Sequence, residues 1–75
     1  MNNLHTSDVV RLKHSIGWAD LPANSVGVVQ SVWFAPTAAY EVEFQRTEAE
    51  GPVRVLVRSD EIELEAETEP VLAIA

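Results

Sequence analysis

The sequence predicts a small all-β domain of five strands curled into a barrel, with a short helical turn near residues 59–61 and an extended C-terminal tail. Helical periodicity is nearly absent, and short valine-rich runs with alternating polar residues are separated by turn residues, a pattern typical of barrels and sandwiches. The 75 residues allow one domain, and they contain no cysteine that could form a disulfide. Because domains of this size are marginally stable, we expect self-association to supply further support.

Strands are expected near residues 8–13, 25–34, 39–46, 52–58 and 61–65. The third is the clearest, because Tyr40, Val42 and Phe44 alternate with polar side chains, as in a sheet with one buried and one solvated face. The fourth and fifth strands alternate in the same way and would bury Val53, Val55, Val57, Ile62 and Leu64.

The pairing of the second and third strands decides which side of the second strand is buried. We expect Phe34 to lie opposite Tyr40, since the alternative register would expose the aromatic side chains. The predicted core of this hairpin is then Val26, Val28, Val32, Phe34, Tyr40, Val42 and Phe44. The opposite face would carry Val29, Trp33 and Leu56, which do not suit a solvated surface and are expected to be covered either by another part of the chain or by another molecule. They are therefore a candidate interface.

The longest irregular stretch, residues 14–24, is rich in turn residues but carries Trp18 and Leu21 as apolar anchors. We expect it to fold over the mouth of the barrel, with these two side chains as loop contacts. For Trp18, packing in the core or the loop is favoured, whereas for Trp33 an interface is favoured.

Residues 8–65 form the predicted barrel, between a flexible N-terminus at 1–7 and a tail at 66–75. The tail consists of an acidic spacer and an apolar run that is either disordered or adds a strand to a neighbouring subunit. The apolar residues of the tail join the predicted interface: Val71, Leu72 and Ile74.

The formal net charge of −7 lies entirely in residues 41–75, which hold three arginines and ten acids. Such a surface repels phosphate backbones and attracts basic proteins, so a basic protein partner is favoured over nucleic acid. On the solvated face we expect Arg54 to lie beside Gln45 and Arg58 beside Glu41, as an exposed ladder of polar and charged pairs.

Catalytic signatures are missing from the sequence. The acids repeat with a period of two, as on the solvated side of a strand, and no serine lies in a nucleophile-elbow motif. His5 and His14 are interpreted as solvated or loop-packing imidazoles, since a metal site would need a third ligand such as Asp8 or Asp20. We therefore expect no enzyme activity, no cofactor and no metal. With no secretory signal and no transmembrane run, we expect a cytoplasmic protein without membrane contact.

Three segments resemble the domain of unknown function 4926 family: "DVVRL" at 8–12, "DLPANSVGVV" at 20–29 and "AYEVEF" at 39–44. The resemblance spans residues 8–65 and implies a small bacterial SH3-like or KOW-type barrel without catalytic residues. The family has a glycine where this chain has Asn24, which also tolerates a left-handed backbone. Gly27 is expected to serve a bend or a close backbone approach rather than phosphate binding.

The function that these observations favour is a non-catalytic protein-binding module that self-associates and contacts another protein. An antitoxin or immunity-like inhibitor of a basic toxin is the alternative, because an acidic surface can cover a basic enzyme. A KOW-like contact with nucleic acid or the ribosome is the third hypothesis, and such binding would weaken steeply with salt.

Overall fold

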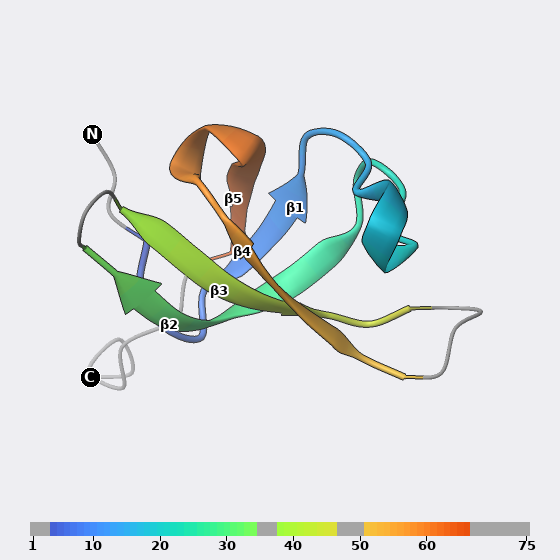
Figure 1. Ribbon diagram of the computed structural model, residues 1–75. Helices are drawn as coiled ribbons and strands as arrows, with labels where there is room; N and C mark the ends of the chain where they lie inside the picture. Colours follow the sequence, from blue (N-terminus) through green and yellow to red (C-terminus); the bar gives the residue numbers. More distant parts are fainter. Residues whose placement is uncertain (1–3, 35–37, 47–50, 67–75) are drawn as a thin grey trace, which may run out of the picture.

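The computed structural model describes residues 4–34, 38–46 and 51–66. These residues form five strands and two 3-10 turns, which are β1 (Val9–Leu12), η1 (Gly17–Ala19), β2 (Val26–Trp33), β3 (Ala39–Phe44), β4 (Val53–Val57), η2 (Ser59–Glu61) and β5 (Ile62–Ala66) (Figure 1). The prediction of an all-β chain with five strands and a helical turn at 59–61 is thereby confirmed.

The five strands form one antiparallel sheet in the order β4-β3-β2-β1-β5. After β4 the chain turns through η2 and returns to pair with β1, so that the last strand lies beside the first (Figure 1). Within the described residues, β4 and β5 are the two edges and do not pair with each other. The sheet is therefore not closed, and the predicted barrel is not confirmed.

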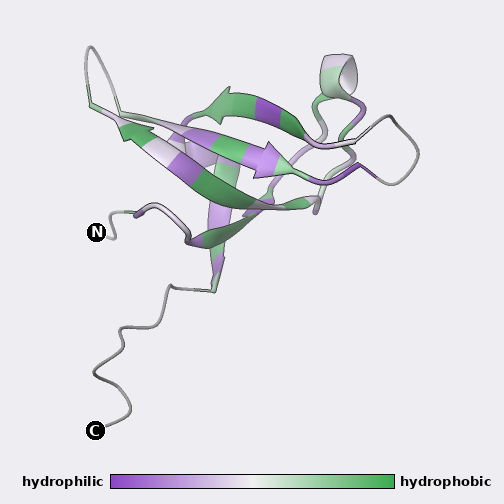
Figure 2. Cartoon of the chain, turned by 90° about the horizontal axis from the view of Figure 1, so that it is seen from below, coloured by the Kyte–Doolittle hydropathy of each residue, from purple (hydrophilic) through white to green (hydrophobic). Residues whose placement is uncertain are grey.

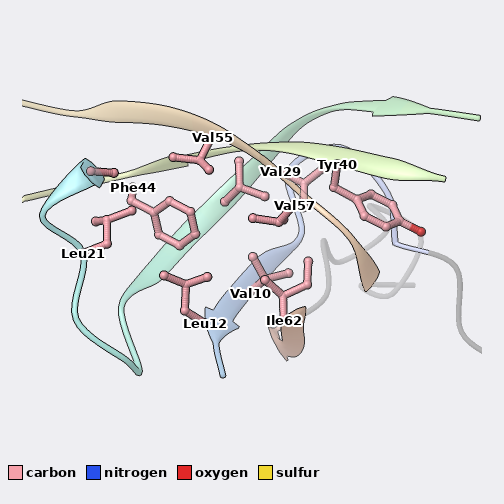
Figure 3. Close-up of a cluster of buried hydrophobic side chains, with 11 residues drawn as sticks. Val10, Leu12, Leu21, Val29, Tyr40, Phe44, Val55, Val57 and Ile62 are labelled. Atoms are coloured by element: carbon pink, nitrogen blue, oxygen red, sulfur yellow. The ribbon is translucent and has the colours of Figure 1, made fainter. Parts of the chain in front are cut away.

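One face of the curled sheet packs on the hydrophobic core (Figure 3). The buried apolar residues are Val10, Leu12, Ala19, Leu21, Val29, Tyr40, Val42, Phe44, Val55, Val57 and Ile62. Figure 2 shows the alternation of hydrophobic and hydrophilic residues along the strands that produces this burial. The predicted inward side of β3 is confirmed, and in β4 the inward valines are confirmed as well, with Val53 partly buried against the core.

The hairpin of β2 and β3 has a register that differs from the predicted one. Val32, and not Phe34, lies opposite Tyr40. The ladder shifts by one residue at Gln30, which has no partner on β3. Such a β-bulge places one extra residue in a strand. The alternation of inward and outward side chains is therefore shifted by one residue between the part of β2 before the bulge and the part after it. The predicted single, regular alternation along β2 is therefore wrong.

Because of the bulge, the first half of β2 buries the side chains that were predicted to be exposed and exposes those that were predicted to be buried. Val29 is 1% exposed and lies inside the core cluster (Figure 3), so its predicted outward position was wrong. Val26 and Val28, predicted in the core, are exposed on the other side of the strand, and Phe34 beyond the end of β2 is exposed as well. Val32, which follows the bulge, does pack against the core as predicted.

The loop before β2 packs on the core through Leu21, which is buried and forms backbone hydrogen bonds with Ile16. Asn24 adopts a left-handed backbone with φ of 73°, in keeping with its expected role in the turn. Trp18 lies on η1 and is 77% exposed, so the expectation that it packs in the core or the loop was wrong.

Candidate interaction surface

Large apolar side chains are exposed on the face of the sheet that points away from the core, here called the outer face. They are Val26, Val28 and Trp33 on β2 and Leu56 on β4. Trp33 is 54% exposed and Leu56 is 62% exposed. The outer face is therefore the candidate interaction surface of this chain.

The indole of Trp33 is held by a chain of two hydrogen bonds. Its Nε1 donates to Ser31 Oγ at 3.1 Å, and Ser31 Oγ donates to Glu41 Oε1 at 2.8 Å. Residues two apart in a strand share a face, so Ser31 and Trp33 lie on the same side of β2. Glu41 lies directly opposite Ser31 on β3. The register of β2 and β3 therefore brings these three side chains together, and the two hydrogen bonds orient the exposed indole ring of Trp33.

The same row of the sheet continues onto β4, where Leu56 lies opposite Glu41. Trp33, Ser31, Glu41 and Leu56 thus form one continuous group across three strands, here called the Trp33 patch. It combines two exposed apolar side chains with one carboxylate between them. A surface of this composition suits a partner that offers both apolar area and positive charge.

A second apolar group on the outer face, the valine strip, consists of Val26 and Val28. Val28 lies between Val9 of β1 and Glu43 of β3, and Val26 lies opposite Arg11 of β1. The strip occupies the half of β2 before the bulge, whereas Trp33 occupies the half after it. The bulge therefore divides the outer face into two neighbouring surfaces.

An arginine–glutamate pair stands on each side of the valine strip. Arg11 makes two hydrogen bonds with Glu65 of β5, at 2.9 and 2.7 Å, and Arg54 of β4 bonds Glu43 at 3.0 Å. The hydrogen bond from Arg11 lowers the pKa of Glu65 and the same bond raises the pKa of Arg11. The strip is thus flanked by both signs of charge.

The cross-strand pairs differ from those predicted because the register is different. Arg54 lies opposite Glu43 rather than beside Gln45. Arg58 bonds Asp60 at 3.2 Å rather than Glu41. Among the described residues, no lysine, arginine or histidine lies within 4.0 Å of the Glu41 carboxylate, whose one side-chain partner is the hydroxyl of Ser31.

The residues predicted for an interface lie in several different places. Trp33 and Leu56 both lie on the outer face, in one patch around β3. Val29 lies in the core and is not part of any surface. Trp18 is exposed, but η1 lies at the opposite end of the sheet from the end of β2 (Figure 1). Val71, Leu72 and Ile74 fall outside the described residues.

The two histidines occupy separate sites at the surface. His5 Nδ1 lies 3.7 Å from Oδ2 of the buried Asp8, and His14 Nε2 lies 3.7 Å from Glu61 Oε2. Within the part of the chain that the structure describes, no group of three or more histidine, cysteine, aspartate or glutamate residues could hold a metal ion. No described helix has the length and apolar character that crossing a membrane requires.

Comparisons with protein-family models, with curated proteins and with solved structures give no match for this chain. The resemblance to the domain of unknown function 4926 family stays a prediction.

Proposed function

We propose that this chain is a non-catalytic, cytoplasmic protein-binding module that contacts another protein through the Trp33 patch. The observation that carries the proposal is Trp33 itself, which is more than half exposed and yet has its indole N–H bonded to Ser31. Tryptophan is enriched among the residues that dominate binding energy. A ring already oriented in the free protein loses less conformational freedom on binding, which favours affinity.

We also propose that the module self-associates, and that the valine strip is the contact between copies. Symmetric dimers bury the same patch on both subunits, so the patch must complement itself. The strip meets this condition, because an apolar centre is flanked by the pairs Arg11–Glu65 and Arg54–Glu43. A two-fold axis through the strip would bring positive groups of one copy toward negative groups of the other.

The binding proposal is tested by affinity capture from an extract of the source organism, with proteins quantified by mass spectrometry. Trp33→Ala removes the anchor of the patch, and Trp18→Ala removes an even more exposed tryptophan on η1 as the matched control. We expect the wild type and Trp18→Ala to retain the same partner and Trp33→Ala to lose it. Retention of that partner by Trp33→Ala would contradict the proposal.

Self-association is tested by light scattering over a range of protein concentrations. The wild type should show a mass above that of one chain, which is 8.3 kDa, and Val28→Lys should return it to the monomer. Trp18→Lys, which adds the same charge away from the strip, should leave the mass unchanged. A wild type that stays monomeric at all concentrations would refute the proposed contact between copies.

A further inference from the structure

We propose that the Trp33 patch binds an arginine side chain of a basic partner protein, with the guanidinium stacked on the Trp33 indole and hydrogen-bonded to the Glu41 carboxylate. This inference rests on the proposed binding function of the patch and adds the chemistry of the partner. It follows from the charges, the hydrogen bonds and the apolar contacts around Glu41.

Glu41 differs from the outer-face carboxylates that have a cation of their own. Glu43 is paired with Arg54, and Glu65 is paired with Arg11. The position on β4 that could have supplied a cation to Glu41 holds Leu56 instead. In the residues that the structure describes, the negative charge of Glu41 is therefore left for a cation that comes from outside the chain.

The carboxylate is also placed well for such a cation. Glu41 is half-buried, which strengthens a charged hydrogen bond relative to one in bulk water. Its Oε1 accepts the hydroxyl of Ser31, and within the described part of the chain Oε2 takes part in no side-chain hydrogen bond. A guanidinium presents several N–H donors in a planar fork, so it can approach the free oxygen and still lie flat against a neighbouring ring.

Trp33 and Leu56 supply the apolar contacts that an arginine side chain needs. Tryptophan is the most favourable aromatic partner for a cation above its face. Because the N–H edge of the Trp33 indole is bonded to Ser31, the exposed part of the ring offers aromatic surface rather than a donor. Leu56, on the other side of Glu41, can contact the methylene groups of an arginine stem.

The overall charge favours a basic partner over other macromolecules. The chain carries a formal net charge of −7, which attracts basic proteins and repels the phosphates of nucleic acids and anionic membranes. General attraction does not select a binding position. A binding position is selected by the one unpaired carboxylate that lies between Trp33 and Leu56, and the experiment must test this position.

The test is a nuclear magnetic resonance titration with a capped oligoarginine peptide, following the indole N–H signals of the two tryptophans. The signals are assigned with Trp18→Phe. We expect the Trp33 signal to shift until it saturates and the Trp18 signal to stay in place. A capped oligolysine peptide should bind more weakly, because an ammonium group lacks the planar fork and stacks less well.

Glu41→Gln is the informative variant, because the amide oxygen can still accept the hydroxyl of Ser31 while the charge is lost. We expect it to weaken oligoarginine binding about tenfold, the loss typical of one charged hydrogen bond. Glu43→Gln is the matched control: it removes the same charge from the same face of β3, where Arg54 already pairs with it. It should weaken binding by less than about twofold, through general attraction alone.

A second variant, Leu56→Lys, places a cation of the chain itself opposite Glu41, at an exposed position where the fold is tolerant. We expect it to compete with the peptide and to weaken binding as much as Glu41→Gln does. Equal weakening by Glu41→Gln and Glu43→Gln, or equal shifts of both tryptophan signals, would overturn the inference. The capture experiment distinguishes failure of this inference from failure of the proposed binding function. If the patch binds a partner without using an arginine, Trp33→Ala still loses that partner, whereas the oligoarginine titration fails.

Discussion

Gly27 of β2 lies directly opposite Phe44 of β3, and the phenyl ring occupies the space that a side chain at position 27 would need. A Cβ at this position would lie 2.7 Å from Phe44 Cδ1 and 2.8 Å from the backbone oxygen of Glu43. A side chain can turn away, but the backbone oxygen is held in the ladder. The expected role of Gly27 in a close approach is thus confirmed, and the approach is to β3.

Gly27→Ala is predicted to destabilise the protein by about 1–3 kcal/mol, because overpacking at a fixed backbone must distort the β2–β3 pairing. Urea denaturation measures the change. Gly17→Ala is the control, since nothing lies within 4 Å of a Cβ there, and its stability should change by less than about 1 kcal/mol. Equal stability of Gly27→Ala and the wild type would show that the ladder yields more easily than the contacts suggest.

Two neighbouring valines provide a direct test of the bulge. Val29 is buried, whereas Val28 is 38% exposed. Val29→Ala should therefore cost about 2 kcal/mol of unfolding free energy by leaving a cavity, and Val28→Ala less than about 1 kcal/mol. Thermal or urea unfolding of both variants gives the comparison. The reverse order of the two effects would support the regular register and refute the bulge.

The strands could be predicted from the sequence wherever alternation is strict. In β3 each inward residue, such as Val42, is followed by a polar one, so one face is buried without ambiguity. In β2 the alternation breaks at Gln30 and Ser31, two polar residues in succession between Val29 and Val32. These two successive polar residues are the sequence signal of an extra residue in the strand. Without knowing how β2 pairs with β3, the signal cannot be distinguished from a solvated end of a strand.

The candidate surface could be predicted only in part. Trp33 and Leu56 were found because they are large apolar residues that the pattern places outside the core. Ser31 and Glu41 were missed, since their contact depends on the shifted register rather than on their own strands. The exposure of Trp18 was missed too, because apolar character in a loop predicts packing, and here Leu21 takes the inward position.

Ser31→Ala tests the hydrogen-bond chain without touching the tryptophan. It removes the acceptor of the Trp33 indole N–H, so that proton should exchange with solvent several-fold faster, as measured by nuclear magnetic resonance. Ser25→Ala is the control, because the hydroxyl of Ser25 bonds Pro22 in a turn. Ser31→Ala also removes the hydrogen bond from Ser31 to Glu41. Both variants should still keep the fold, since each exposed or half-buried hydrogen bond contributes only about 1 kcal/mol. Unchanged exchange in Ser31→Ala would mean that the indole is held by other contacts.

The pair Arg11–Glu65 predicts a pH dependence of stability. Because the hydrogen bond from Arg11 lowers the pKa of Glu65 in the folded protein, the pair stabilises above the ordinary glutamate pKa of about 4.3. This stabilisation is lost as the pH falls through the lowered value. Arg11→Gln should therefore unfold at lower urea concentration than the wild type at about pH 7, and at the same concentration at about pH 2. If the two proteins still differ as much in their unfolding urea concentration at acidic pH, the effect of Arg11→Gln comes from lost packing of the Arg11 methylene groups and not from the ion pair.

The most direct test of the binding surface is photo-crosslinking from position 33 in living cells. A photoreactive phenylalanine analogue, which keeps an aromatic ring for the contact, replaces Trp33 in one variant and Trp18 in another. Both side chains are exposed, and η1 lies at the opposite end of the sheet from the end of β2. We predict a discrete adduct with another polypeptide from position 33 and none from position 18. Adducts of equal yield from both positions, or from position 18 alone, would contradict the assignment of the binding surface to the Trp33 patch.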